Sequence, residues 1–184
     1  MDNTRQTTSL LPHCIPCRSH CCRYSSPILD QDERDKIVAL TGKDYFERIV
    51  TGDGVYYVVG RKSDGSRRTI ALDENGRGDP CTFLSADGHC SIHEIKPLDC
   101  AAYPIRAVPM ENGELSWHLH RSCPAAPSLS SAFVRRAKQI AEASARRFTP
   151  VAYTHWLRHF SQWTLLSGSV LKRPPSGESW DSER

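Results

Sequence analysis

The chain has 184 residues, of which 39% are hydrophobic, enough for the core of one domain with or without an appendage. Its net charge of +3 is too small to indicate nucleic-acid binding by itself. No run approaches the ~18 apolar residues of a membrane-spanning helix, so we expect no membrane span.

The N-terminal stretch shows neither a secretory signal nor an ordered element. Residues 1–14 lack a continuous apolar core and a small-residue cleavage site, so we expect the protein to stay in the cytoplasm. We expect residues 1–12 to be disordered, as the first residues of a domain often are.

Two helical segments are predicted after the first cysteines. The sequence LDQDERDKIVALTG predicts a short helix, because Asp30 can cap its start and Glu33 stands three residues later as a capping-box partner. Gly42 is placed to end this helix. The next run, KDYFERIV, is expected to add one or two helical turns.

The middle of the chain is predicted to contain short strands. The sequence GVYYVVGRKSDGSRRTIAL has two β-rich runs on either side of SDGS, a pattern typical of a hairpin. The sequence AVPMENGELSWHLH repeats the pattern, with Asn112–Gly113 at the turn. Short hairpins punctuated by cysteines are therefore expected in this region.

The last third of the chain is predicted to be helical. The sequence SAFVRRAKQIAEASARRF places apolar and small side chains on one helical face. In TPVAYTHWLRHFSQW, Thr149 can cap a second helix and Pro150 takes its first position. Residues 168–184 are rich in proline, serine and charge, so we expect a flexible tail. The predicted buried positions are Phe133, Ala137, Ile140, Ala141, Ser144, Phe148, Tyr153, Trp156, Leu157 and Phe160.

Eight cysteines are the most informative feature of the sequence. Four of them lie in CIPCRSHCC, and three more lie in CTFLSADGHCSIHEIKPLDC. In a reducing compartment, clustered thiols more often bind metal or do redox work than form structural disulfides. We therefore predict metal ligation, with a C-x-x-C redox pair and a disulfide framework as the alternatives. The candidate ligands are Cys14, Cys17, Cys21, Cys22, Cys81, Cys90, Cys100 and Cys123.

The number of cysteines allows one or two metal centres. Four thiolates complete the tetrahedral shell of zinc, and four also anchor a 4Fe-4S iron–sulfur cluster. The adjacent Cys21 and Cys22 would point to opposite sides of an extended chain, so they would serve different centres, or one would bind while the other packs. Spacing alone does not separate zinc from iron–sulfur, but eight thiols exceed what one structural zinc requires and favour iron–sulfur slightly.

The residues around Cys90 predict a helix that begins next to a thiol. Ser91 and Glu94 form the S-x-x-E pattern of a capping box, so a short helix is expected directly after Cys90. The N–H groups and positive end of such a helix would stabilise a thiolate. Pro97 is expected to end the helix shortly before Cys100.

The order of the cysteine motifs is similar to that of a known family. C-x-x-C-x-x-x-C-C is followed by CTFL, by DGHCSI and by KPLDCAAYP. Over residues 14–123 this order resembles the cysteine-cluster family of zinc- or iron-chelating domains, the YkgJ type, which is related to a domain of flagellin lysine N-methylase. Lys96 and Ala101 stand where that family often has arginine, but no thiol of the pattern is missing. The resemblance implies metal binding rather than a particular reaction.

Together these patterns predict a small α+β, cysteine-rich, metal-stabilised domain with short hairpins and two C-terminal helices. The expected division is a cysteine-cluster domain over residues 13–126, a helical extension over 127–167 and a tail over 168–184. We expect a structural or redox-accessory role. One alternative is an enzyme or enzyme component that modifies a protein substrate, for example by lysine N-methylation. The other is an adaptor that binds a protein partner through the basic helix predicted near residues 131–148 and through the tail.

Histidines are further candidate ligands. Those that flank the cysteine segments could each replace a thiol, although solvated loop histidines are commoner. His118 and His120 alternate on a predicted strand and could share a face. His155 and His159 have the i, i+4 spacing of a helical metal pair, but the glutamate of HExxH is absent, so a polar helix edge is expected. The flanking histidines are His13, His20, His89 and His93.

Overall fold

The computed structural model describes residues 19–70, 78–120 and 123–161, and it confirms the predicted α+β class. The predictions for residues 1–12 and 168–184 fall outside this part. The elements are α2 (His20–Tyr24), α3 (Gln31–Thr41), β1 (Phe46–Val50), β2 (Val55–Val59), the 3-10 helix η1 (His93–Ile95), α4 (Leu98–Ala102), β3 (Ile105–Pro109), β4 (Leu115–Leu119), the 3-10 helix η2 (Ala126–Ser128), α5 (Ser131–Ala145) and α6 (Pro150–Phe160).

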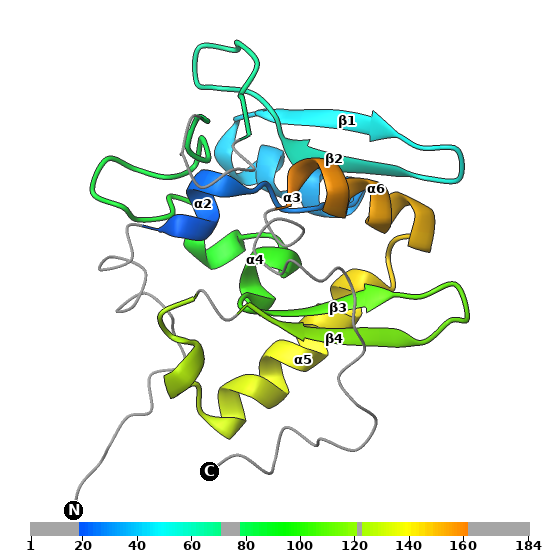
Figure 1. The fold of residues 1–184 in the computed structure, drawn as a ribbon. Helices are drawn as coiled ribbons and strands as arrows, with labels where there is room; N and C mark the ends of the chain where they lie inside the picture. Colours follow the sequence, from blue (N-terminus) through cyan, green and yellow to red (C-terminus); the bar gives the residue numbers. More distant parts are fainter. Residues whose placement is uncertain (1–18, 71–77, 121–122, 162–184) are drawn as a thin grey trace, which may run out of the picture.

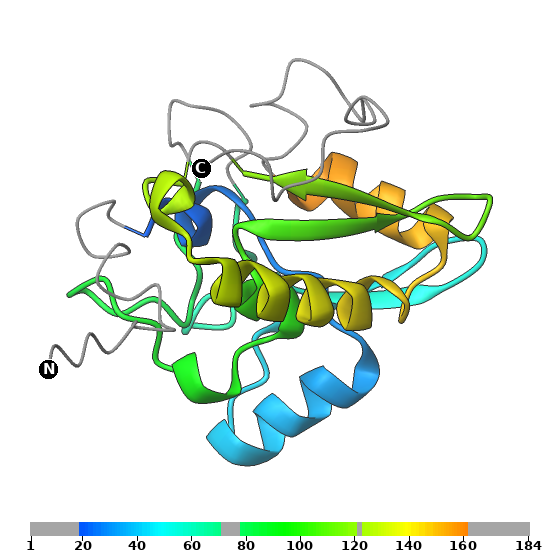
Figure 2. The ribbon, with the colours of Figure 1, turned by 90° about the horizontal axis from the view of Figure 1, so that it is seen from below.

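Two antiparallel hairpins frame the described part of the molecule. β1 pairs with β2, β3 pairs with β4, and these two sheets are separate. In Figures 1 and 2 the turns of both hairpins point to the same side, and Figure 1 shows α6 between them. α2 and the loop that begins at residue 78 lie on the opposite side in both views, with α4 next to them. The segments that carry the described cysteines before β3 therefore gather away from the hairpin turns.

Helix α3 forms as its end signals predict. The Asp30 carboxylate accepts a hydrogen bond from Glu33 N–H at 2.8 Å, and Gly42 ends the helix at φ +68°. The Glu33 carboxylate in turn accepts a hydrogen bond from Leu98 N–H at 2.7 Å. This contact ties the start of α3 to the start of α4, the helix that carries Cys100.

The helical turns predicted over KDYFERIV are wrong. Phe46–Val50 form strand β1, which runs antiparallel to β2 with Phe46 opposite Val59 and Val50 opposite Val55. Helix α3 has already ended at Gly42, so the run is too short to form an independent helix. Its aromatic and β-branched side chains suit a strand with one buried face, and Phe46 is buried.

The hairpin predicted around SDGS is reduced to a turn. Gly65 takes φ +83°, and a single bridge joins Arg61 to Arg67 across the turn. The residues that follow, up to Ile70, form no named strand in the described chain, because β2 is paired with β1 on one edge and bridged to Leu29 through Tyr57 on the other. The second predicted hairpin is confirmed: β3 pairs with β4, and Gly113 takes φ +81° in the turn.

The main core lies where β2, β3, α5 and α6 meet. Trp156 and Tyr56 are fully buried in it, and the predicted apolar faces of both C-terminal helices contribute to it. Ala137 and Ala141 of α5 are buried in this cluster, and such small side chains allow close packing. Thr149 caps α6 by accepting a hydrogen bond from Ala152 N–H at 3.2 Å.

A second apolar cluster lies between α3, the first hairpin and the loop after residue 78. Phe83 and Ile92 of that loop are buried in it beside Ile37 of α3. The partly buried Cys81 and Cys90 pack against the same cluster. Two of the candidate ligands are thus held by the core and not by an exposed loop.

Candidate metal centre

Helix α2 carries Cys21 and Cys22 side by side. Their sulfur atoms lie 4.0 Å apart, and both residues are partly buried. The expectation that the two side chains point to opposite sides was wrong, because it assumed an extended chain. In a helix, neighbouring residues are rotated by only about 100°, so adjacent sulfurs can stay close.

The loop after residue 78 is bound directly to the α2 segment. Cys81 N–H donates a hydrogen bond to the carbonyl of Cys22 at 2.6 Å. Ser19, which precedes α2, donates from its hydroxyl to the carbonyl of Gly88 at 2.8 Å. These two hydrogen bonds hold the first cysteine segment against the second.

The tight turn predicted between Cys81 and Cys90 is present. Leu84 N–H donates to the carbonyl of Cys81 at 2.8 Å, and Leu84 forms an antiparallel bridge with Cys90. Gly88 takes φ +86°, a conformation that favours glycine. The turn therefore returns the chain toward Cys81.

The helix predicted directly after Cys90 starts later and is shorter. It is the 3-10 turn η1, and Ser91 does not cap it. The turn ends at Ile95, just before the Lys96–Pro97 pair, as predicted, and Pro97 also precedes α4 as its N-cap residue. Cys100 consequently lies in the middle of α4 instead of after a helix.

Four thiols from these segments lie within electrostatic reach of one another. Burial raises the pKa of the Cys100 thiol well above its usual value, and negative charge on Asp99, Cys22, Cys81 and Cys90 would raise it further. Burial also raises the pKa of Cys81 to about 12 and raises that of Cys90, with the charge of Cys22 adding to both. The structure thus brings together Cys22, Cys81, Cys90 and Cys100.

The thiols are neighbours, but their arrangement is not a finished coordination shell. Within residues 19–70, 78–120 and 123–161, no three Cys, His, Asp or Glu side chains form a group that could hold a metal ion. The donor chemistry nevertheless fits, because clustered thiolates are the preferred ligands of zinc and of iron–sulfur clusters. Binding and local folding are coupled in such sites, so ligands can close around the metal.

The other four cysteines lie in different places. Cys21 adjoins Cys22, and Cys14 and Cys17 lie outside the described residues. Cys123 is buried in the segment after β4, where its N–H donates to the carbonyl of His120 at 3.0 Å.

A buried arginine, which the sequence did not single out, joins the two cysteine segments. Arg68 is 3% exposed, and among the described residues the hydrogen-bond partners of its guanidinium are backbone carbonyls. These carbonyls come from both sides of the site, including Cys22 and the residue before Cys81. The five hydrogen bonds run from Nε to Asp79 at 3.0 Å and Pro80 at 2.9 Å, from Nη1 to Val59 at 3.0 Å, and from Nη2 to Cys22 at 3.4 Å and Ser25 at 3.2 Å.

Arg68 is a buried cation that forms no ion pair with a carboxylate in the described part of the chain. Burial lowers the pKa of its guanidinium, and negative charge on Cys81 and then on Cys22 acts in the opposite direction. An arginine stays protonated in proteins, so Arg68 places a fixed positive charge beside these two thiols. The two groups whose negative charge would act most strongly on Arg68, Cys81 and Cys22, are therefore candidate metal ligands.

A buried ion pair holds α4, the helix that carries Cys100, in place. Asp99, next to Cys100 in α4, lies 2.9 Å from Nη2 of Arg106 in β3. Arg106 also donates to the hydroxyl of Ser161 at 2.8 Å, and its guanidinium lies 4.4 Å from the ring of Trp156. Burial raises the pKa of Asp99, and the charge of Arg106 opposes this shift. The network fixes α4, and with it Cys100, against β3 and α6.

Comparison with known proteins identifies the family of the chain. A family model described as "CxxCxxCC: Putative zinc- or iron-chelating domain" matches residues 13–124. The chain belongs to this family. The match spans more than half of the chain and contains all eight cysteines, so the family assignment supports metal binding. No curated protein and no solved structure matches the chain.

The histidines of this zinc- or iron-chelating family member lie in several environments. His89 is exposed, and Nε2 of its ring lies 4.0 Å from a carboxylate oxygen of Asp87. Burial lowers the pKa of His93 and of His118. His120 is buried, with its ring 5.4 Å from that of Tyr103. His13 and the side chain of His20 are outside the description.

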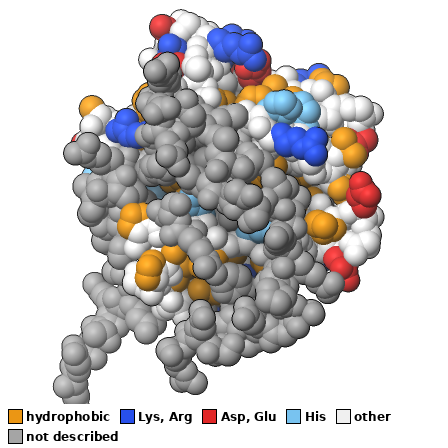
Figure 3. All heavy atoms as spheres, in the orientation of Figure 1, with side chains coloured by type: hydrophobic (Ala, Val, Ile, Leu, Met, Phe, Trp, Pro, Cys, Tyr) orange, Lys and Arg blue, Asp and Glu red, His pale blue; other side chains and the backbone are white. Residues whose placement is uncertain are grey.

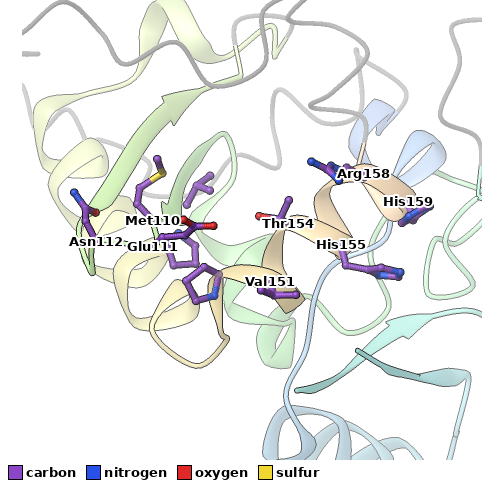
Figure 4. Close-up of a pocket in the computed structure, with 11 residues that line it drawn as sticks. Met110, Glu111, Asn112, Val151, Thr154, His155, Arg158 and His159 are labelled. Atoms are coloured by element: carbon purple, nitrogen blue, oxygen red, sulfur yellow. The ribbon is translucent and has the colours of Figure 1, made fainter. Parts of the chain in front are cut away.

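The chelating-family protein also has a groove away from the thiols, between the turn of the second hairpin and α6. Its volume is about 610 Å³, and its lining includes Met110, Glu111, Val151, Thr154, His155 and His159 (Figure 4). Figure 3 shows histidine and basic side chains side by side on the surface over α6. No helix of the described residues is long and apolar enough to span a bilayer.

Proposed function

We propose that Cys22, Cys81, Cys90 and Cys100 form a four-thiolate centre that holds an iron–sulfur cluster or a zinc ion. The observation that supports this proposal is the mutual electrostatic influence of four thiols from α2, from the loop after residue 78 and from α4. Separate chain segments then cohere through one centre, which explains how a small, loop-rich domain gains stability.

The charge of Arg68 supports a metal centre over disulfide bonds. A zinc ion bound by four thiolates carries a net negative charge, as does a cubane cluster with four thiolate ligands. A buried guanidinium without an anionic partner is costly, and an anionic centre beside it reduces that cost. Disulfides between the same cysteines would be neutral and would leave the Arg68 charge to the carbonyl dipoles and to the weaker influence of the Asp79 carboxylate.

The number of thiols favours the iron–sulfur cluster over a single zinc ion. The chain contains four cysteines besides the proposed centre, which could serve a second centre or remain spare. A bound cluster would supply one-electron redox chemistry, whereas zinc would act as a structural link. In both cases Cys22, Cys81 and Cys90 supply thiolates, and the protein keeps them partly shielded from water.

Zinc uptake at pH 7 is expected to release about one proton for each ligating thiol, and hence about four for this centre. The raised pKa values of Cys81, Cys90 and Cys100 keep these thiols protonated in the metal-free protein at neutral pH. Each must lose its proton to bind, so the apparent zinc affinity should fall as the pH falls. Calorimetry in two buffers of different ionisation enthalpy measures the proton count, and a count near zero would rule out a thiolate centre.

A further inference from the structure

A pair of histidines at one end of the groove takes no part in the proposed cysteine centre. His155 and His159 stand one helical turn apart in α6, with ring centroids 4.5 Å apart and ring planes inclined at 41°. Figure 4 shows both rings at the same end of the groove, with Met110 and Asn112 at the other. Residues at i and i+4 share a helix face, which explains why the rings meet.

A buried tyrosine holds one of the two rings. The Tyr56 hydroxyl lies 2.7 Å from Nδ1 of His155, and Tyr56 is fully buried in the main core. This hydrogen bond fixes the direction of the ring and leaves Nε2 as the nitrogen available to a ligand. Metal-binding histidines usually have their second nitrogen held in this way by a neighbouring polar group.

We propose that His155 and His159 bind one divalent transition-metal ion, at a site separate from the cysteine centre, and that Tyr56 positions His155. Imidazole nitrogens suit zinc, nickel and copper ions. Water or a ligand in the groove would complete the coordination, because the described residues supply no third protein ligand. The missing glutamate of HExxH means that the pair carries no implied hydrolytic reaction.

The charged residues of the groove are compatible with a bound cation. Arg158 is exposed, and Figure 4 shows its side chain directed away from the two rings. The carboxylate of Glu111 lies in the same groove and adds a negative charge to it. In the described part of the chain, neither His155 nor His159 forms an ion pair with a carboxylate that would compete with a metal.

Titration of nickel(II) chloride into protein loaded beforehand with one equivalent of zinc, which thiolates take up in preference to a pair of imidazoles, tests the site. We expect calorimetry to show one nickel ion per chain, with paramagnetic broadening of the His155 and His159 ring signals in NMR spectra. His159→Ala changes an exposed residue and should weaken nickel binding by about tenfold or more. Tyr56→Phe removes only the hydroxyl and should weaken binding by about tenfold.

Arg136→Ala is the control, because it changes an exposed residue of α5 that does not line the groove. It should leave nickel binding unchanged. Equal nickel affinity in wild type and His159→Ala would overturn the site, as would equal weakening by Arg136→Ala. Wild-type affinity and unchanged broadening in Tyr56→Phe would overturn its positioning role. Zinc content measured in the same samples reports on the cysteine centre independently.

Discussion

Replacing Cys90 with serine is expected to remove most of the bound metal and to lower the melting temperature of the protein. Negative charge on Cys90 would raise the pKa of both Cys81 and Cys100, so its sulfur lies within electrostatic range of both thiols. A serine hydroxyl stays protonated at neutral pH and cannot replace a thiolate ligand. Loss of one ligand should weaken metal binding by about 100-fold or more, beyond the effect of a supporting residue. The bound metal contributes to folding, so stability should fall with it.

The matched control for this substitution is Ser91→Ala. Ser91 is exposed and does not cap η1, so its removal should change neither metal content nor stability. Metal content by elemental analysis and melting by circular dichroism can be compared in the same preparations. Wild-type metal content and melting in Cys90→Ser would remove Cys90 from the ligand set.

Arg68→Met is expected to lower metal affinity by about 10–100-fold and to lower the free energy of unfolding by about 3 kcal/mol or more. The substitution removes the positive charge beside Cys22 and Cys81 and leaves buried carbonyls without donors. It also removes one of the links between the two cysteine segments, while the Cys81–Cys22 backbone hydrogen bond remains. Zinc affinity can be measured by competition with a chromophoric chelator, and stability by urea unfolding of the zinc-loaded protein.

Two variants separate the role of Arg68 from a general effect of losing an arginine. Arg67→Met removes the neighbouring arginine, whose side chain is 78% exposed and pairs with Glu47 on the surface, and should have little effect. Arg68→Lys keeps the charge but loses the planar fork, so its metal affinity should lie between those of wild type and Arg68→Met. Unchanged zinc affinity in Arg68→Met would show that the arginine serves the fold alone.

The longer helices with end signals at known positions could be predicted from the sequence, whereas the capping box at Ser91 and Glu94 gave only the short turn η1, and strand β1 was missed. Helix α3 has Asp30 and Gly42 at its ends, and α6 has Thr149 and Pro150 at its start. The prediction for the segment that forms strand β1 was wrong because five residues are too few to show a helical or a strand period reliably. Its conformation depends on pairing with β2, a contact that local propensity does not contain.

The sequence identifies the candidate ligands but not the residues that support them. All eight cysteines are visible as a pattern, whereas their grouping depends on contacts such as that between Cys81 N–H and the Cys22 carbonyl. Arg67 and Arg68 are adjacent residues of the same type, so the sequence does not distinguish them. In the structure Arg67 is exposed and Arg68 is only 3% exposed. The role of Arg68 arises from carbonyls of distant segments, which only the folded chain brings together.

Metal analysis of the wild-type protein purified without oxygen tests the thiolate centre most directly. We expect a brown protein with absorbance near about 400 nm and with stoichiometric iron and sulfide, as iron–sulfur ligation produces. A colourless protein with stoichiometric zinc would keep the thiolate centre and replace the cluster with zinc. A protein that contains neither metal, and whose cysteines do not react as free thiols, would contradict the thiolate centre and establish disulfide bonding instead.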